Sequence, residues 1–341
     1  MEPHGHWHGN CMSGRQLDED DVRVRPSRSS RPRSKTRPSH DGATSAMVTL
    51  VDRGRITCAV EGDPQREVVA VKARELGRKA VAVGDQVRLV GDLSGKPDTL
   101  VRLVQLDPRS TALRRTADDD DPYERIIVAN VDLMGIVVAL ADPPPRMGLI
   151  DRCLIAAFDA GVEPLLILTK SDLGDAQDLL ANYRPLGIEA HLTERGSDVT
   201  GQRSIAERLH GKTSVLVGHS GVGKSTLVNV LVPDADRATG KVNVSTGRGR
   251  HTSTSVQALP LPGGGWIVDT PGVRSFGLAH VDPSRVVSAF SDLSGGIDGC
   301  PRGCTHDEPE CNLDVWVATG NAPTERLESL RRILRAQHSE Q

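Results

Sequence analysis

The sequence predicts a multi-domain protein: a small OB-like β-barrel, then an α/β domain with a parallel sheet, then a small α-helical domain. Three observations predict this order. Short runs of β-branched residues come first, strands alternating with helices follow, and cysteines and a histidine cluster near the C-terminal end. A chain of 341 residues is also too long for one small core. We expect a disordered basic arm over 1–45, the barrel over 46–110, the α/β domain over 111–280 and the helical domain over 281–341.

The charge distribution separates the N-terminal arm from the rest of the chain. The formal net charge is −3, but residues 18–21 are all acidic and every charge in 22–38 is positive. Such an arm suits phosphate-rich partners, and a solvated tail with no partner is the alternative. No apolar run approaches the roughly 20 residues that span a bilayer, and the first residues lack the apolar segment of a secretory signal. We therefore expect a cytoplasmic protein without membrane contact. We also expect a monomer.

The individual elements follow from composition and periodicity. In the barrel, the runs 47–62, 66–77 and 86–92 are rich in β-branched residues and are separated by Gly, Asp and Pro. Residues 109–122 look like a linker. Beyond it, strands alternate with helices, which argues for a parallel sheet covered on both faces. Strands are expected within 125–142, 164–168, 188–192 and 213–217 and as a pair within 256–269. Helices are expected over 147–161, 176–187, 204–211, 225–232 and 323–337.

A glycine-rich segment after the apolar strand fits the phosphate-binding loop pattern. Residues 218–225 read GHSGVGKS, which matches G-x-x-x-x-G-K-[ST] between a strand and a helix, the context that the motif requires. Lys224 is expected to reach the β- and γ-phosphates, and the Ser225 hydroxyl to ligate Mg²⁺. A chance glycine-rich turn is the weaker alternative. The residues expected to bind the nucleotide here are Gly218, His219, Ser220, Gly221, Val222, Gly223, Lys224, Ser225 and Thr226.

Two further segments complete the predicted phosphate end. Asp269-Thr270-Pro271-Gly272 ends an apolar strand downstream of the loop. In P-loop GTPases an Asp at this position holds Mg²⁺ through water and the Gly amide senses the γ-phosphate. We expect these roles for Asp269 and Gly272. The polar stretch between the two motifs is expected to order around nucleotide, with Thr252 completing the Mg²⁺ shell and Thr254 as the fallback. An ordinary surface loop is the alternative for this stretch.

The base-reading segment lies upstream of the phosphate loop. Thr169-Lys170-Ser171-Asp172 ends the buried strand over 164–168 and resembles N-K-x-D with Thr in place of Asn. Asp172 is expected to accept from guanine N1–H and the 2-amino group, and Lys170 to pack along the base. The hydroxyl of Thr169 can form one tethering hydrogen bond, whereas the side-chain amide of Asn can form two. A helix N-cap at Ser171 or Asp172 is the alternative.

The order of these motifs is permuted along the chain. The base-reading loop precedes the phosphate loop, whereas in ordinary GTPases it comes last. A parallel sheet tolerates this permutation when the original ends lie close together. The segment after Gly272 then leads directly into the C-terminal domain, so the γ-phosphate state can move that domain.

A metal site is predicted near the C-terminal end. Cys300, Cys304, His306 and Cys311 offer three thiolates and one imidazole, a closed set suited to one structural Zn²⁺. Clustered cysteines in a cytosolic chain favour a metal over disulfides. Buried cysteines beside a surface histidine are the alternative. We expect no catalytic role for this zinc, because no coordination position stays open.

Together, GHSGVGKSTLVN, RGRHTST, DTPGVRSFGL, TKSDL and the Cys/His cluster resemble the ribosome small-subunit-dependent GTPase A family over about residues 47–335. The resemblance implies an OB fold, a circularly permuted GTPase domain and a zinc-containing helical domain. It also implies binding to the 30S subunit and its 16S rRNA, with GTP hydrolysis to GDP stimulated there, and an apolar Val273 where many GTPases place a catalytic Gln. The sequence departs from the family at Thr169, usually Asn, and in two zinc-ligand gaps that are each one residue shorter.

The sequence therefore favours a GTPase that acts in late assembly of the small ribosomal subunit, with hydrolysis coupled to release. His251 is the candidate that positions the attacking water, and a contact to RNA or phosphate is its alternative role. A small-molecule kinase or ATPase and an RNA-binding module with a vestigial nucleotide site are the rival functions. The DTPG and TKSD segments argue against the first. The intact Lys224, Ser225 and Asp269 argue against the second.

Overall fold

The structure is a computed structural model that describes residues 40, 42–52, 54–77, 80–96, 98–115, 125–196, 199–233, 256–270, 278 and 281–336. Most of the predicted basic arm, residues 1–39, lies outside the described residues. The domain boundaries given above stay predictions. None of the helices in the described ranges is both long and apolar enough to cross a membrane.

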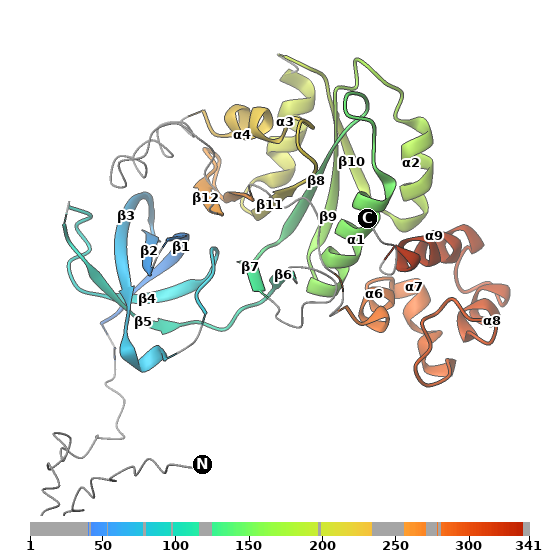
Figure 1. The fold of residues 1–341 in the computed structure, drawn as a ribbon, viewed down its shortest axis with the longest axis horizontal. Coiled ribbons are helices and arrows are strands. Elements are labelled where there is room, and N and C mark those ends of the chain that lie inside the picture. The colour runs from blue at the N-terminus through green and yellow to red at the C-terminus, as the bar shows by residue number, and fades with distance from the viewer. Residues whose placement is uncertain are drawn as a thin grey trace, which may run out of the picture. The chain divides into compact units, whose positions relative to one another are not determined.

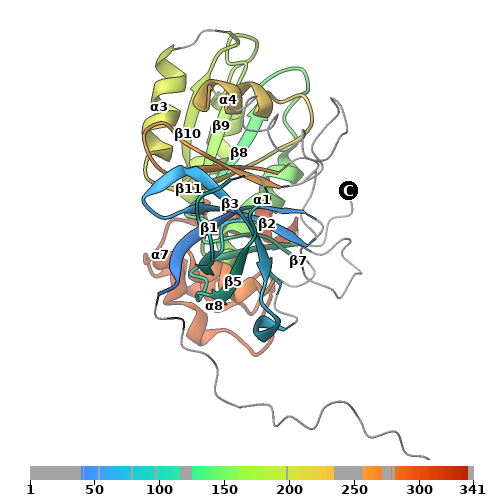
Figure 2. The same cartoon turned by 90° about the vertical axis from the view of Figure 1, so that its left-hand side faces the viewer.

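The first five strands close into the predicted OB-like barrel (Figures 1 and 2). β1 pairs with β2, β2 with β3, β3 in parallel with β5, β5 with β4, and β4 again with β1. The last of these pairings leaves no free edge between β1 and β4, which is what closure of a sheet requires. The strands are β1 (Thr44–Asp52), β2 (Arg55–Val60), β3 (Asp63–Lys72), β4 (Gln86–Val90) and β5 (Val101–Leu106).

Alternate residues of these strands fill the barrel interior, as the twofold period of a strand dictates. Ala46 and Val48 of β1, Val87 and Leu89 of β4, and Cys58 of β2 belong to one buried cluster. The strand β5 is not predicted by the sequence pattern. Its VRLVQL run alternates buried and exposed positions only in part, with adjacent Leu103 and Val104 both buried.

The predicted linker over 109–122 is wrong in part. Ala112–Arg115 forms a strand, β6, that pairs antiparallel with β7 (Arg125–Ala129) in a separate two-stranded sheet. The physical reason is that Leu113 is fully buried and pairs with the equally buried Val128. A single apolar side chain within a charged run gave no periodic signal. Arg109 also has a structural role, because its guanidinium donates to both oxygens of the fully buried Asp85, over 2.6 and 2.8 Å.

The α/β domain has a mainly parallel sheet, as predicted. Its strand order is β10-β9-β8-β11-β13-β12, with only β12 antiparallel to its neighbours. The antiparallel β12 also pairs with β1 of the barrel at one position, Leu50 opposite Gln257. The strands are β8 (Leu133–Ala139), β9 (Glu163–Thr169), β10 (Glu189–Thr193), β11 (Thr213–Val217), β12 (Gln257–Pro260) and β13 (Trp266–Asp269).

Helices cover both faces of this sheet (Figure 1). On β11, Val215 and Val217 pack into the same buried cluster as α1 and α2, whereas Leu216 packs with α3 and α4. This alternation explains why the strands read as continuous apolar runs, since both faces are buried. The helix α3 begins about five residues earlier than predicted. The helices are α1 (Met147–Ala160), α2 (Gln177–Tyr183), α3 (Val199–Leu209) and α4 (Lys224–Leu231).

The C-terminal part is helical, as predicted. It contains α6 (Pro283–Ser288), α7 (Ser291–Ser294), α8 (Asn312–Ala318) and α9 (Thr324–Arg335). The predicted amphipathic helix is α9. It buries Leu327, Leu330, Ile333 and Leu334 along one face and packs against α1. The helical spacing of these residues is what the sequence pattern required.

Candidate nucleotide and metal sites

Three loops and the end of β13 lie at the carboxyl edge of the parallel sheet. The loops follow β8, β9 and β11, and these strands and β13 are neighbours that all point the same way. In open α/β sheets this edge is where ligands bind. The sheet order therefore brings together the base-reading segment, the phosphate loop and Asp269, which are far apart in the sequence.

The phosphate loop leaves β11 through two positions that only glycine tolerates. Gly218 has φ +148°, and a Cβ there would lie 2.3 Å from the carbonyl oxygen of Val137. Gly223 has φ +98° immediately before α4 begins at Lys224. These glycines let the backbone turn sharply into the start of the helix, and the first N–H groups of a helix suit an anion because they have no partner within it. Lys224 is then folded back into the loop, and its Nζ donates to the carbonyls of Gly218 at 2.5 Å and His219 at 2.9 Å.

Lys224 and Asp269 are electrostatically coupled. Burial lowers the pKa of Lys224 and raises the pKa of Asp269, and the charge of each partly offsets the shift of the other. Asp269 ends β13 beside β11, and the buried Thr270 fixes that strand end by donating to the carbonyl of Leu216 at 2.9 Å. Ser225 lies exposed in the first turn of α4. A cation and a carboxylate at one site are what an Mg²⁺-phosphate group requires.

Thr169 connects the base-reading segment to the phosphate loop. Its buried hydroxyl donates to the carbonyl of Val222 at 2.6 Å and lies 3.4 Å from that of Val138. The tether expected from a hydroxyl at this position is therefore present. Lys170 follows in the left-handed region, with φ +57°, and its ammonium hydrogen-bonds to the carbonyl of Asp142 in the loop after β8.

Asp172 has a partner that sequence reasoning missed. Arg195, in the loop after β10, donates from its backbone N–H to Oδ1 at 3.1 Å and from Nε to Oδ2 at 2.8 Å. The hydrogen bonds from Arg195 lower the pKa of the Asp172 carboxyl. One signal was available in the sequence: a loop that follows a parallel strand reaches the same sheet edge as its neighbours.

Several predicted site residues lie outside the described residues. They are His251, Thr252, Thr254, Gly272 and Val273. Their roles stay predictions.

The four predicted metal ligands do come together. The ligand atoms of Cys300, Cys304, His306 and Cys311 all lie within 4.8 Å of one another. Cys300 Sγ is 3.6 Å from His306 Nδ1 and 3.9 Å from Cys311 Sγ, and Cys311 Sγ is 3.9 Å from Nδ1. A tetrahedron with zinc bond lengths has edges of about 3.5–3.8 Å. The donor set and its spacing thus fit Zn²⁺, with Nδ1 as the histidine ligand.

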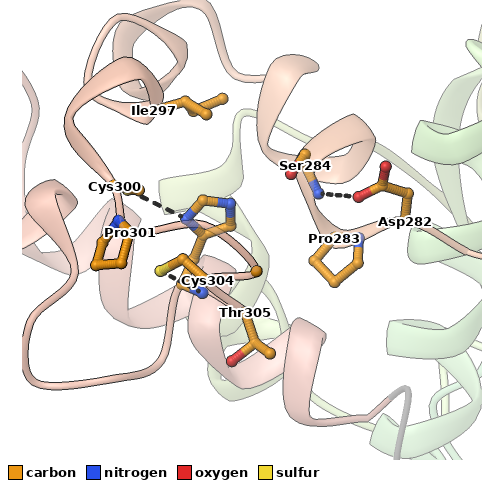
Figure 3. A pocket seen from close by; sticks show the side chains of 10 residues that line it. Asp282, Pro283, Ser284, Ile297, Cys300, Pro301, Cys304 and Thr305 are labelled. Atoms are coloured by element: carbon orange, nitrogen blue, oxygen red, sulfur yellow. Dashed lines mark hydrogen bonds between the residues drawn. The ribbon is translucent and has the colours of Figure 1, made fainter.

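The shell around the cluster restrains two of the ligands. The backbone N–H of His306 donates to Cys304 Sγ at 3.3 Å, and Arg331 Nε donates to the His306 carbonyl at 2.8 Å. Burial raises the pKa of the Cys304 thiol to about 12 and lowers the pKa of His306. Three of the four ligands, Cys300, Cys304 and His306, line a cavity of about 250 Å³ together with Asp282 and Ser284. Figure 3 shows Cys300 and Cys304 on one side of it and Asp282 and Ser284, at the start of α6, on the other.

Comparisons with known proteins agree with this geometry. The sequence profile of the RsgA GTPase family matches residues 106–279. The small ribosomal subunit biogenesis GTPase RsgA of Pseudomonas fluorescens (strain SBW25) is 42% identical over 235 residues, covering 67% of each chain. The protein of the same name from Pseudomonas syringae pv. tomato is 38% identical over 288 residues, covering 79% of this chain and 82% of its own.

Two solved structures share the fold. YjeQ from Thermotoga maritima aligns with a TM-score of 0.61 at 24% identity, covering 88% of this chain and all of its own. YloQ, described as a circularly permuted GTPase, aligns with the same TM-score of 0.61 at 22% identity and covers 90% of this chain.

Proposed function

Because the chain belongs to the RsgA GTPase family, we propose how its own residues carry out GTP hydrolysis in the biogenesis of the small ribosomal subunit. The reaction converts GTP and water into GDP and phosphate. The observation that carries the assignment of residues is the hydrogen bond from Thr169 to the Val222 carbonyl. It joins the base-reading segment to the phosphate loop, so one nucleotide can contact both.

The phosphate loop holds the triphosphate. The backbone N–H groups of 218–226 bind phosphate oxygens, aided by the partial positive charge at the start of α4. Lys224 contacts the β- and γ-phosphates. Ser225, Asp269 and Thr252 would hold Mg²⁺, which when bound would neutralise charge that develops on the phosphates. The Gly272 amide reads the γ-phosphate.

The base-reading segment selects guanine. Asp172 accepts from N1–H and the 2-amino group, and the stem of Lys170 packs along the base. Thr169 keeps this segment at a fixed distance from the phosphate loop through its bond to Val222. Adenine presents a ring-nitrogen acceptor where guanine presents N1–H, so the Asp172 carboxylate disfavours ATP.

His251 positions the attacking water. With Val273 where many GTPases place Gln, a neutral imidazole accepts from water and orients it for in-line attack. Positioning is a large part of catalysis in phosphoryl transfer, so a weak base suffices. The competing role for His251 is a contact with the ribosome. In that case saturation with 30S subunits restores full turnover to a His251→Ala variant.

One structural zinc ion would be held by Cys300, Cys304, His306 and Cys311, and it would organise the C-terminal helices. The barrel and this helical region bind the 30S subunit, at 16S rRNA or ribosomal proteins. Binding there stimulates hydrolysis, and hydrolysis lowers the affinity and releases the protein as a monomer into the cytoplasm. These partner and location assignments rest on the family and on the fold.

Turnover of GTP titrated with purified 30S, 50S and 70S particles tests the proposal. Of the three particles, we expect only the 30S subunits to stimulate GTP turnover strongly. Lys224→Ala should abolish hydrolysis and weaken GTP binding without unfolding the protein, since it removes the charge that contacts phosphate. Lys212→Ala is the matched control, because Lys212 lies at the opposite end of β11, within 3.5 Å of Glu163. Unchanged turnover in Lys224→Ala, or equal stimulation by all particles, contradicts the proposal.

A further inference from the structure

The loop after β10 presents Arg195 to the predicted guanine reader. Two donors of Arg195 contact the two carboxylate oxygens of Asp172 separately, the backbone N–H at Oδ1 and the guanidinium Nε at Oδ2. The Arg195 side chain is 59% exposed and that of Asp172 is 26% exposed. The pair therefore lies at the surface of the site, where a base can approach it.

The backbone fixes the position of Arg195. β10 pairs in register with β9, so Thr193 lies opposite Thr169. The backbone N–H of Ser171 donates to the Thr193 carbonyl at 3.2 Å, which joins the two loops directly. On the other side, Gln202 of α3 donates to the Gly196 carbonyl at 3.0 Å. The backbone is thus hydrogen-bonded on both sides of Arg195, at Thr193 and at Gly196.

The pattern of contacts leaves acceptor capacity on both oxygens. An ionised carboxylate has about four lone-pair positions, two on each oxygen. Arg195 occupies one position on Oδ1 and one on Oδ2. The backbone N–H of Asp172 also hydrogen-bonds to its own carboxylate. Acceptor capacity therefore remains beside Arg195, and each of the two oxygens can face one of the two donors of the guanine edge, N1–H and the 2-amino group. With both oxygens contacted, the carboxylate cannot rotate freely about its last bond.

We propose that Arg195 is a positioning residue of the guanine site, which orients the Asp172 carboxylate so that both oxygens accept from the base at once. The inference rests on the proposed function, in which Asp172 reads guanine. It adds a specificity-determining residue to a site whose other tether, Thr169, is a single hydroxyl. The hydrogen bonds that lower the Asp172 pKa also keep the carboxylate an acceptor only.

The test compares GDP with inosine diphosphate, whose base lacks the 2-amino group. In Arg195→Gln, we expect GDP to bind about three- to tenfold more weakly and inosine diphosphate less than about twofold more weakly. Arg195→Lys keeps the charge but not the fixed Nε donor. Its affinity for GDP should lie between those of wild type and Arg195→Gln. The difference in GDP affinity between wild type and Arg195→Gln should become smaller in about 1 M salt, since exposed ion pairs are screened.

The control variant is Arg203→Gln, which removes the same charge from an exposed position on the neighbouring helix α3. It should leave both affinities unchanged. Equal losses for GDP and inosine diphosphate in Arg195→Gln would mean that Arg195 only shapes the loop, and unchanged affinities would mean that it has no role. Either result overturns the inference.

A second variant separates this inference from the proposed function. Asp172→Asn should collapse the preference for GDP over ADP. If it does and Arg195→Gln has no effect, only the role of Arg195 is wrong. If Asp172→Asn leaves the preference unchanged, the assignment of Asp172 as the base reader is wrong as well.

Discussion

At the scale of single residues, Thr169 joins the two segments of the proposed nucleotide site. A hydroxyl has one donor, and in this structure that donor goes to the Val222 carbonyl rather than remaining within the base-reading loop. The family usually has Asn here, with two amide donors. Part of the missing restraint is supplied from elsewhere, by Arg195 on Asp172 and by Lys170 on the Asp142 carbonyl.

Replacing this hydroxyl should weaken nucleotide binding. Thr169→Val keeps the shape and leaves the buried Val222 carbonyl without its donor, at a cost of about 1–2 kcal/mol of stability. GDP affinity, measured by calorimetry, should fall about three- to tenfold because the base reader is no longer held to the phosphate loop.

Thr111→Val is the matched control for this prediction. It removes a similar bond, from the Thr111 hydroxyl to the Val131 carbonyl at 2.7 Å. We expect it to cost comparable stability and leave GDP affinity unchanged. Equal affinity losses in the two variants would mean that Thr169 acts on stability alone.

At the scale of secondary-structure elements, the C-terminal helices are short and need a cross-link. α6, α7 and α8 have six, four and seven residues, and isolated helices of that length are unstable in water. The Cys/His segment lies between α7 and α8, and Cys311 is the N-cap residue of α8. A metal bound there fixes the direction in which α8 leaves the cluster.

Removing a ligand should therefore unfold this region locally. Cys304→Ser should lower bound zinc from about one ion per chain to almost none, because structural zinc binding is itself folding energy. Hydrogen exchange should accelerate in α8 and much less in the barrel. Cys58→Ala, in the barrel core, should retain zinc. Metal analysis that finds no zinc in wild-type protein prepared without chelators contradicts the prediction.

At the scale of the whole molecule, α1 connects the nucleotide site to the C-terminal helices. Its first turn lies beside the phosphate loop, where Ile150 and Val222 line the same small cavity. Farther along, Asp151 accepts from both Arg332 of α9, at 2.6 and 2.7 Å, and the Tyr183 hydroxyl at 3.0 Å. The guanidinium of Arg332 also lies 4.9 Å from the centre of the Tyr183 ring.

Breaking this pair should loosen α9 from α1. The Asp151 side chain is 6% exposed, so Arg332→Met leaves a buried carboxylate without its cation, at a cost of roughly 3 kcal/mol at neutral pH. Hydrogen exchange of α9 should report the loss. Arg335→Met is the control on the same helix, because its side chain is 65% exposed and pairs with Asp307, and it should cost less than about 1 kcal/mol.

The loss of stability in Arg332→Met should depend on pH in a defined direction. Burial raises the pKa of Asp151 above 3.8, against the opposing charge of Arg332. A raised folded pKa means that stability is fully present below the unfolded value and falls as pH rises through the folded value. Without Arg332 the pKa of Asp151 in the folded protein rises further. The difference in unfolding free energy between wild type and variant should therefore increase as pH increases above 3.8. A difference that decreases with rising pH contradicts this account.

The sequence by itself determined the site motifs and most elements. The segments GHSGVGKS, DTPG and TKSD and the Cys/His cluster match motifs whose spacings are fixed because nearby residues contact one phosphate, base or metal. The alternation of apolar runs with amphipathic helices fixed the parallel sheet in the same local way. Such signals depend on neighbours in the chain, so they can be found without coordinates.

Only the tertiary structure decided which distant residues meet. Strand order places the loop after β10 beside the loop after β9, and so puts Arg195 on Asp172. Closure of β4 on β1, the β6–β7 pair and the contact of Arg332 with Asp151 depend equally on packing between remote segments. No periodicity records such contacts, because they arise from the register and burial of whole elements rather than from residues next to each other in the chain.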